Sequence, residues 1–319
     1  MADHADDGGN NDAVFVYMGG EIPEHLRETI THVRVHKSVK IIRREAFLNC
    51  TNLVSIEMHD GVKIIKDCAF RFCTSLRGIK LAGVRVIEEA AFCNCHALES
   101  VEFGNKLEII GGIVFLSCNS LRNIKISKVR VIGNYAFQKC QQLTDVELSE
   151  DLETIGYGAF YNCPRLRRVA IPLKANMFGD HVFRGCNSLS QVDLVGGIHK
   201  TVSSLPLESW RNEMDDLIRR INRDLPNTLH LNKTVVTQQW MERVLERMEH
   251  YKSEHYALLK NNMTQLELAL WKSNLPNVDA AVSRDEARVT CGSNIIIPLV
   301  LSFLNDNDVF PLAGTNGLD

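Results

Sequence analysis

Apolar residues recur along the first two thirds of the chain at intervals of 22 or 23 residues. The phenylalanine column consists of Phe47, Phe70, Phe92, Phe115, Phe137, Phe160 and Phe183. Three residues after each Phe comes the cysteine column, Cys50, Cys73, Cys95, Cys118, Cys140, Cys163 and Cys186, and three further on a column of leucines. A unit this short cannot bury its own apolar face, so the pattern predicts a solenoid of stacked units.

Each unit ends in a stretch that alternates between apolar and polar residues. In Leu-x-x-Ile-x-Leu, Ile79 and Leu81 share one face of a predicted strand and Lys80 lies on the other. The segment around each Phe is predicted to form about one turn of helix on the opposite wall. A cryptic first copy with Ile30, Val33 and Val35 lacks the Phe and Cys, as a terminal cap does. The sequence therefore predicts a parallel sheet of about eight strands over residues 14–200.

The apolar period changes from that of a strand to that of a helix after Gly196 and Gly197. Residues 201–274 are predicted to form an α-helical hairpin, with a first helix between Pro206 and Pro226 and a longer second helix over 234–270. Two interpretations of the hairpin stay open, and both can hold. It covers the apolar end of the last repeat, or its longer helix pairs with a second chain as a coiled coil.

The rest of the chain has the composition of connecting and terminal segments. We expect disordered ends at 1–13 and 311–319, a flexible linker over 275–292 and a short apolar helix over 293–310. The start has no basic and apolar leader, and no segment reaches the roughly 20 apolar residues of a membrane span. The expected location is cytoplasmic, with a nuclear location left open, and the cysteines are expected to be reduced.

The repeat pattern Ile-x-x-x-Ala-Phe-x-x-Cys-x-x-Leu-x-x-Ile-x-Leu resembles the BspA-like class of leucine-rich repeats over about residues 30–195. The resemblance implies a right-handed leucine-rich-repeat solenoid that binds other macromolecules and has no catalytic residues. The helical tail, with Glu208–Met214, Arg247–Lys252 and Leu266–Lys272, is similar to that of a large group of diatom leucine-rich repeat proteins.

The outward position of each predicted strand carries charges of alternating sign. This column reads Arg34, Glu57, Lys80, Glu102, Lys125 and Glu147, followed by Ala170 and Asp193, and a second column contains Arg77, Glu99 and Arg122. Such ladders either fix the register of the strands or form a charged surface for a partner. Towards the end of the stack, Arg165, Arg167 and Arg168 have no opposite charge within the repeat pattern, which indicates a place for an acidic partner.

The sequence favours a binding protein over an enzyme. We find no nucleophile, metal-ligand or phosphate-loop motif, so we expect no catalytic residues, cofactor or metal. The expected partner is a protein or peptide, with a possible homodimer through helix 234–270. The alternative is a nucleic-acid or phosphate-ligand binder that uses Arg43, Arg44 and the Arg165–Arg168 cluster. The net charge of −3 argues against nucleic acid.

Overall fold

The computed structural model describes residues 14–195 and 208–274. The expected disordered ends, the linker over 275–292 and the short apolar helix over 293–310 lie outside these residues. The chain divides into two units, Met1–Arg247 and Met248–Asp319.

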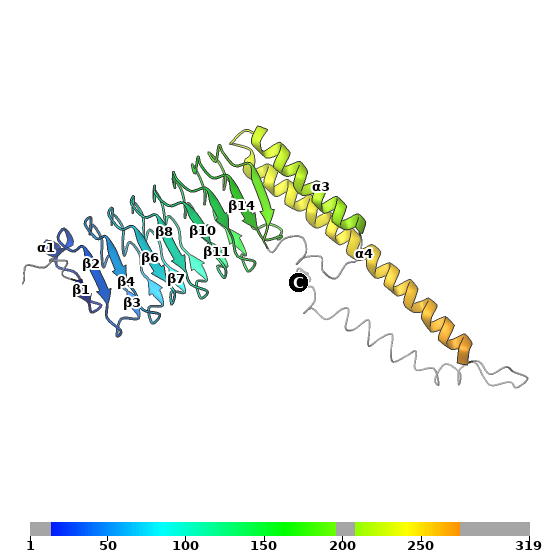
Figure 1. Cartoon of the computed structure of the whole chain (residues 1–319), viewed down its shortest axis with the longest axis horizontal. Helices are drawn as coiled ribbons and strands as arrows, with labels where there is room; N and C mark the ends of the chain where they lie inside the picture. Colours follow the sequence, from blue (N-terminus) through cyan, green and yellow to red (C-terminus); the bar gives the residue numbers. More distant parts are fainter. Residues whose placement is uncertain (1–13, 196–207, 275–319) are drawn as a thin grey trace, which may run out of the picture. The chain divides into compact units, whose positions relative to one another are not determined.

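The first unit is a stack of parallel strands, as the sequence predicts (Figure 1). The longer strands form one sheet that is interrupted once, with the order β1-β2-β4-β6-β8 in its first part and β10-β12-β14-β15 in its second part. Their bounds are β1 Val14–Tyr17, β2 His32–Val35, β4 Ser55–Glu57, β6 Gly78–Leu81, β8 Ser100–Phe103, β10 Asn123–Lys125, β12 Asp145–Glu147, β14 Arg168–Ile171 and β15 Gln191–Leu194. Equivalent residues of successive repeats are paired, for example Ile79 with Val101.

The first strand, β1, is one that the repeat pattern does not predict. It pairs in parallel with β2, and Tyr17 is buried at its end. The centroid of the Tyr17 ring lies 4.8 Å from that of Phe47. Tyr17 therefore fills the place of the phenylalanine that the cryptic first copy lacks. The helix α1 (Glu24–Arg27) takes up the capping segment before β2.

A second parallel sheet, also absent from the sequence-based prediction, runs along another wall of the stack in the order β13-β11-β9-β7-β5-β3. Its strands have two residues each: β3 Ile41–Ile42, β5 Ile64–Ile65, β7 Val86–Ile87, β9 Ile109–Ile110, β11 Val131–Ile132 and β13 Thr154–Ile155. The second residue of each strand is buried. The isoleucine five residues before each of the first six phenylalanines of the column is therefore a strand residue.

The predicted helical turn around each Phe is wrong. These segments are turns whose alternate N–H groups point along the stack: Phe47 N–H donates to Ala69 O of the next repeat at 2.7 Å. Glu45 and Asn49 on either side have positive φ values of 56° and 60°. Left-handed residues reverse the direction of the peptide groups, so every second N–H group donates to the next repeat and the remaining ones close separate turns that do not continue as a helix.

The core is a pile of equivalent side chains, as predicted. All seven phenylalanines have no exposed surface. Their rings are stacked with centroids 4.9 to 6.0 Å apart. Each ring covers the one before it, so every repeat depends on its neighbours for the burial of its core.

The helical tail that follows the solenoid contains α3 (Glu208–Asp224), a short 3-10 turn (Leu225–Asn227) and α4 (Lys233–Asn274). Within the first unit, Trp240 Nε1–H of α4 donates to Leu217 O of α3 at 3.0 Å, and Arg247 forms an ion pair with Glu213 at 2.6 Å. The two helices therefore form the predicted hairpin, and α4 has 42 residues, a few more than its apolar stripe indicates.

Candidate binding surfaces

The outward column of the sheet forms ion pairs two by two. Arg34 contacts Glu57 at 2.7 Å, and Lys80–Glu102 and Lys125–Glu147 each measure 3.1 Å. The alternation breaks between these pairs because β4 and β6 are paired only at Ser55 and Gly78, and because the sheet is interrupted between β8 and β10. Each of these charges thus has its counter-ion on one neighbouring strand.

The second column behaves differently. Arg77, Glu99 and Arg122 are exposed, and none forms an ion pair with another residue that the structure describes. Ala170, placed in the outward column by its register, is 2% exposed, so the charged column does not continue across β14.

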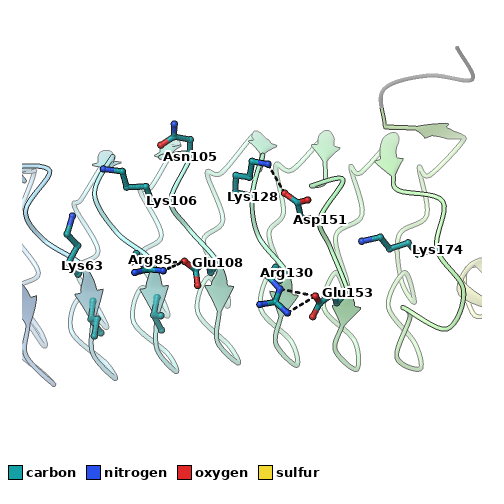
Figure 2. A pocket seen from close by; sticks show the side chains of 12 residues that line it. Lys63, Arg85, Asn105, Lys106, Glu108, Lys128, Arg130, Asp151, Glu153 and Lys174 are labelled. Carbon is teal, nitrogen blue, oxygen red and sulfur yellow. Dashed lines mark hydrogen bonds and ion pairs between the residues drawn. The ribbon is translucent and has the colours of Figure 1, made fainter. Parts of the chain in front are cut away.

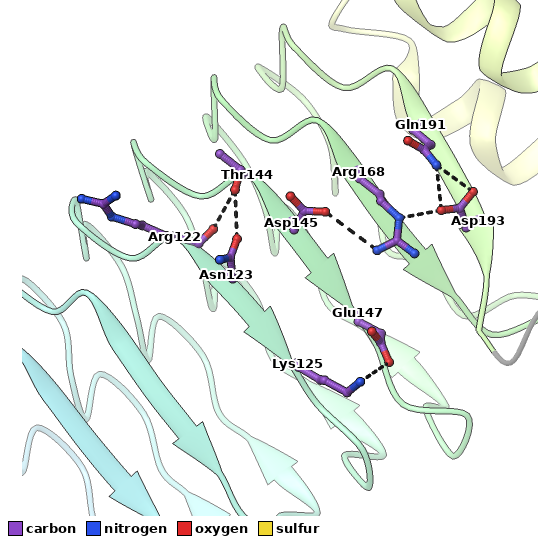
Figure 3. Close-up of polar contacts among 9 residues, drawn as sticks. All are labelled: Arg122, Asn123, Lys125, Thr144, Asp145, Glu147, Arg168, Gln191 and Asp193. Carbon is purple, nitrogen blue, oxygen red and sulfur yellow. Dashed lines mark hydrogen bonds and ion pairs between the residues drawn. The ribbon is translucent and has the colours of Figure 1, made fainter.

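The basic cluster near the end of the stack is partly paired, which corrects the interpretation from the sequence. Arg168 contacts Asp193 at 2.6 Å and Asp145 at 3.8 Å, and Figure 3 shows it between these two carboxylates. Arg165 donates to the Gln142 side chain, whereas Arg167 is exposed. Asp145 lies opposite Arg168 at the equivalent position of the neighbouring repeat, so the repeat spacing contained this contact. The contact from Arg168 to Asp193 is diagonal, and a comparison of equivalent positions misses it.

The other basic spot, at the start of the stack, is small. Arg43 and Arg44 are exposed, and Arg44 forms an ion pair with Glu45 at 3.2 Å. The arginines of the alternative function therefore lie near opposite ends of the solenoid, and two of the five have carboxylate partners.

A groove that the sequence analysis missed runs along the side of the stack, with a volume of about 980 Å³. We call it the side groove. Its charged and polar lining comes from the turns that lead into the second sheet (Figure 2). The lining residues are Lys63, Ile64, Arg85, Val86, Asn105, Lys106, Glu108, Lys128, Arg130, Asp151, Glu153 and Lys174.

Backbone hydrogen bonds keep the side groove in register. Arg85 N–H donates to Lys63 O, Glu108 N–H to Arg85 O and Arg130 N–H to Glu108 O, each at 2.8 Å. The side chains that precede the short strands therefore form a row with one residue per repeat. Six cations and three carboxylates line the groove, an excess of three positive charges.

Three of these cations have carboxylate partners. Arg85 contacts Glu108 at 2.5 Å, Lys128 contacts Asp151 at 2.9 Å and Arg130 contacts Glu153 at 2.7 Å. The 23-residue spacing of these three pairs was available in the sequence. It was not recognised because the residues lie outside the alternating strands.

The cysteine column has a polar role as well as an apolar one. Cys118 Sγ–H donates to Phe92 O of the preceding repeat at 3.3 Å, and the same contact recurs from Cys73, Cys95, Cys140, Cys163 and Cys186 at 3.1 to 3.3 Å. Burial raises the pKa of these thiols, and it raises the pKa of Cys50 to about 11. Protonated, buried thiols are poor nucleophiles, which favours a structural role.

Within the described part of the chain, no cluster of three or more His, Cys, Asp or Glu residues could hold a metal.

The last repeat has polar groups with no further repeat to receive them, and the helical hairpin supplies partners. Phe183 N–H donates to Thr234 Oγ1 of α4, and Val192 N–H to Asn222 Oδ1 of α3, both at 2.8 Å. In the preceding repeat, Phe160 N–H donates to a backbone carbonyl, that of Val182. Lys233 Nζ is buried and donates to Asn187 O at 3.1 Å and Leu189 O at 2.5 Å, and desolvation lowers its pKa.

This architecture, with one buried Phe, Cys and Leu in each of seven stacked repeats, defines a leucine-rich repeat solenoid. The sequence matches the BspA type leucine rich repeat region in six copies, over residues 26–129 and 114–205. The chain belongs to the BspA-type leucine-rich repeat family, as the repeat pattern indicates. Members are generally binding proteins without catalysis.

Solved structures of bacterial leucine-rich repeat proteins are similar to the chain. The Treponema pallidum leucine rich repeat protein TpLRR is 30% identical, with 55% of this chain and 83% of that chain covered and a TM-score of 0.47. A leucine rich cell surface protein from Faecalibacterium prausnitzii is 21% identical, with 52% and 67% covered and a TM-score of 0.25. No curated protein matches the chain. Among the described residues, no helix has the length and apolar character to cross a membrane.

Proposed function

We propose that this protein is a non-catalytic protein-interaction module whose solenoid recognises a protein or peptide through its charged side chains. The observation that carries this proposal is the side groove, an open surface along several repeats with exposed cations and carboxylates. Repetition supplies a long surface of fixed spacing, which suits an extended partner. The neutralised outward column of the sheet has less charge to offer, because its ion pairs satisfy one another.

The proposal is tested by crosslinking in the native cell, followed by mass spectrometry of the full-length chain. Partner peptides linked to solenoid lysines, such as Lys63, Lys80, Lys106 or Lys125, are the expected result. Partners attached only to residues beyond the solenoid would contradict the assignment of the binding surface.

The helical hairpin serves, in this proposal, as the C-terminal cap of the solenoid. Thr234, Asn222 and Lys233 form hydrogen bonds with polar groups of the last repeat that the hairpin covers. A buried N–H without an acceptor costs about 1 to 3 kcal/mol, so side-chain caps of this kind stabilise the end of the stack.

A homodimer through α4 is a second proposal, independent of the first. Beyond the first unit, α4 exposes apolar side chains, with Leu258 54% and Leu266 65% exposed. Burial of such residues against a second copy would stabilise a coiled coil. Light scattering of the full chain should give twice the 36.0 kDa of one chain, and Leu266→Glu should shift the mass towards the monomer. A monomeric wild-type protein would contradict the dimer and leave the solenoid proposal untouched.

A further inference from the structure

We infer that the side groove binds an extended acidic peptide with carboxylates spaced to meet Lys63, Lys106 and Lys174. This inference rests on the proposed protein-binding function and specifies the chemistry of the partner. It places the recognition site along the turns that enter the second sheet. The charged columns that the sequence singled out lie elsewhere.

Lys63, Lys106 and Lys174 of the side groove have no carboxylate partner among the described residues. Lys63 Nζ donates to Asp60 O at 2.8 Å, a neutral carbonyl that leaves its positive charge uncompensated. Neither Lys106 nor Lys174 forms an ion pair with another described residue. Figure 2 shows these three side chains along the groove without dashed contacts, whereas the remaining cations are joined to carboxylates. The excess charge of the groove thus resides on three separated ammonium groups.

The spacing of the three lysines along the stack suits an extended peptide. Lys63 and Lys106 belong to turns two repeats apart, and Lys106 and Lys174 to turns three repeats apart. Neighbouring strands are about 4.8 Å apart, which gives separations of roughly 10 Å and 14 Å along the stack. An extended peptide rises about 3.3 Å per residue, so these separations correspond to about three and about four residues.

The lining of the side groove favours a peptide over a nucleic acid. Single-stranded nucleic acids are bound by aromatic side chains that stack on bases, together with a continuous row of cations. The lining of the groove contains no aromatic residue, and its cations alternate with Glu108, Asp151 and Glu153. A nucleic acid carries one negative charge per nucleotide, so some of its phosphates would lie close to these carboxylates. A peptide with spaced carboxylates has no negative charge at those positions. Asn105 and the apolar residues Ile64 and Val86 add contacts suited to a peptide backbone and its neutral side chains.

The test measures the binding of a fluorescent extended peptide to the full-length protein by anisotropy. The probe contains three Glu residues separated by about three and about four positions, with Ser and Val elsewhere, and a second probe carries Gln at the three Glu positions. We expect the Glu probe to bind at least about tenfold more tightly than the Gln probe at low salt, and its affinity to fall as salt rises.

Matched variants locate the site. The triple variant Lys63→Glu, Lys106→Glu and Lys174→Glu should weaken binding of the Glu probe by at least about tenfold. The control, Lys80→Glu, Arg122→Glu and Lys125→Glu, makes the same change of charge on the sheet face and should leave the affinity within about twofold. The neutral variants Lys63→Gln, Lys106→Gln and Lys174→Gln should give an intermediate loss, and they keep the test valid if the reversed variant fails to fold.

Three results would overturn the inference: equal loss in both triple variants, equal binding of the Glu and Gln probes, or tighter binding of a single-stranded oligonucleotide of the same length. Crosslinks from a cellular partner to Lys80 or Lys125 would in that case preserve the proposed protein-binding function. The experiments therefore distinguish a wrong assignment of the side groove from a wrong assignment of the protein-binding function.

Discussion

Replacing Phe115 with alanine should lower the free energy of unfolding by about 3 to 5 kcal/mol, because it removes a ring from the middle of the stack and leaves a cavity. Phe115 has no exposed surface, and the centroid of its ring lies 5.4 Å from that of Phe92 and 5.2 Å from that of Phe137. The loss affects two neighbouring repeats, since each ring covers the next. Urea denaturation monitored by circular dichroism measures the change.

The control for this substitution is Glu102→Ala on the outer face of the same region. Glu102 is exposed and contacts Lys80 at 3.1 Å, and an exposed ion pair contributes less than about 1 kcal/mol. Equal destabilisation by the two substitutions would show that the inward and outward positions are wrongly assigned.

The second large effect is expected at the junction of the solenoid and the hairpin. Thr234→Val keeps the shape of the side chain but removes the oxygen that accepts the Phe183 N–H at 2.8 Å. The N–H group is then left buried without a partner, which should cost about 1 to 3 kcal/mol. Hydrogen exchange should also show faster exchange at the Phe183 amide than in the wild-type protein.

The same substitution elsewhere on α4 controls for the change of residue type. Thr264 is exposed, and its hydroxyl donates to Lys260 O at 2.9 Å within the helix. Thr264→Val should change the stability by less than about 0.5 kcal/mol. If Thr234→Val had an equally small effect and the Phe183 amide kept its protection, the hairpin would not act as a cap.

The sequence predicted the elements that depend on a repeated apolar period. Ile79 and Leu81 alternate with Lys80, and that alternation identifies a strand with one buried face. The short strands of the second sheet could not be recognised in this way, because two residues such as Ile64 and Ile65 are too few to alternate. Their β-branched side chains were the available signal.

The predicted helical turn failed for a different reason. In a segment such as Glu45–Cys50, every second N–H group donates to the next repeat, and two of its residues have left-handed conformations. Tertiary stacking therefore overrides local preference in these segments. The repeat period alone identified them as neighbours across the stack.

The binding surfaces were predicted less well than the fold. Within the outward column, the sequence placed Arg34 and Lys80 beside their carboxylate partners, but it treated Arg168 as unpaired. Contacts between different columns depend on the offset of the strands, which repeat spacing does not give. The side groove is formed by turns, where no alternation marks the outward side chains.

The stacked core requires that the cysteine column is buried between successive repeats. Thiol labelling of the native protein with an alkylating reagent, read by mass spectrometry, tests it at separate positions. Cys73, Cys95, Cys118, Cys140, Cys163 and Cys186 have no exposed surface and raised pKa values, whereas Cys68 is half-buried. We expect Cys68 to be labelled first and the six column cysteines to react only on unfolding. Labelling of Cys118 in the native protein as fast as Cys68 would contradict the stacked core.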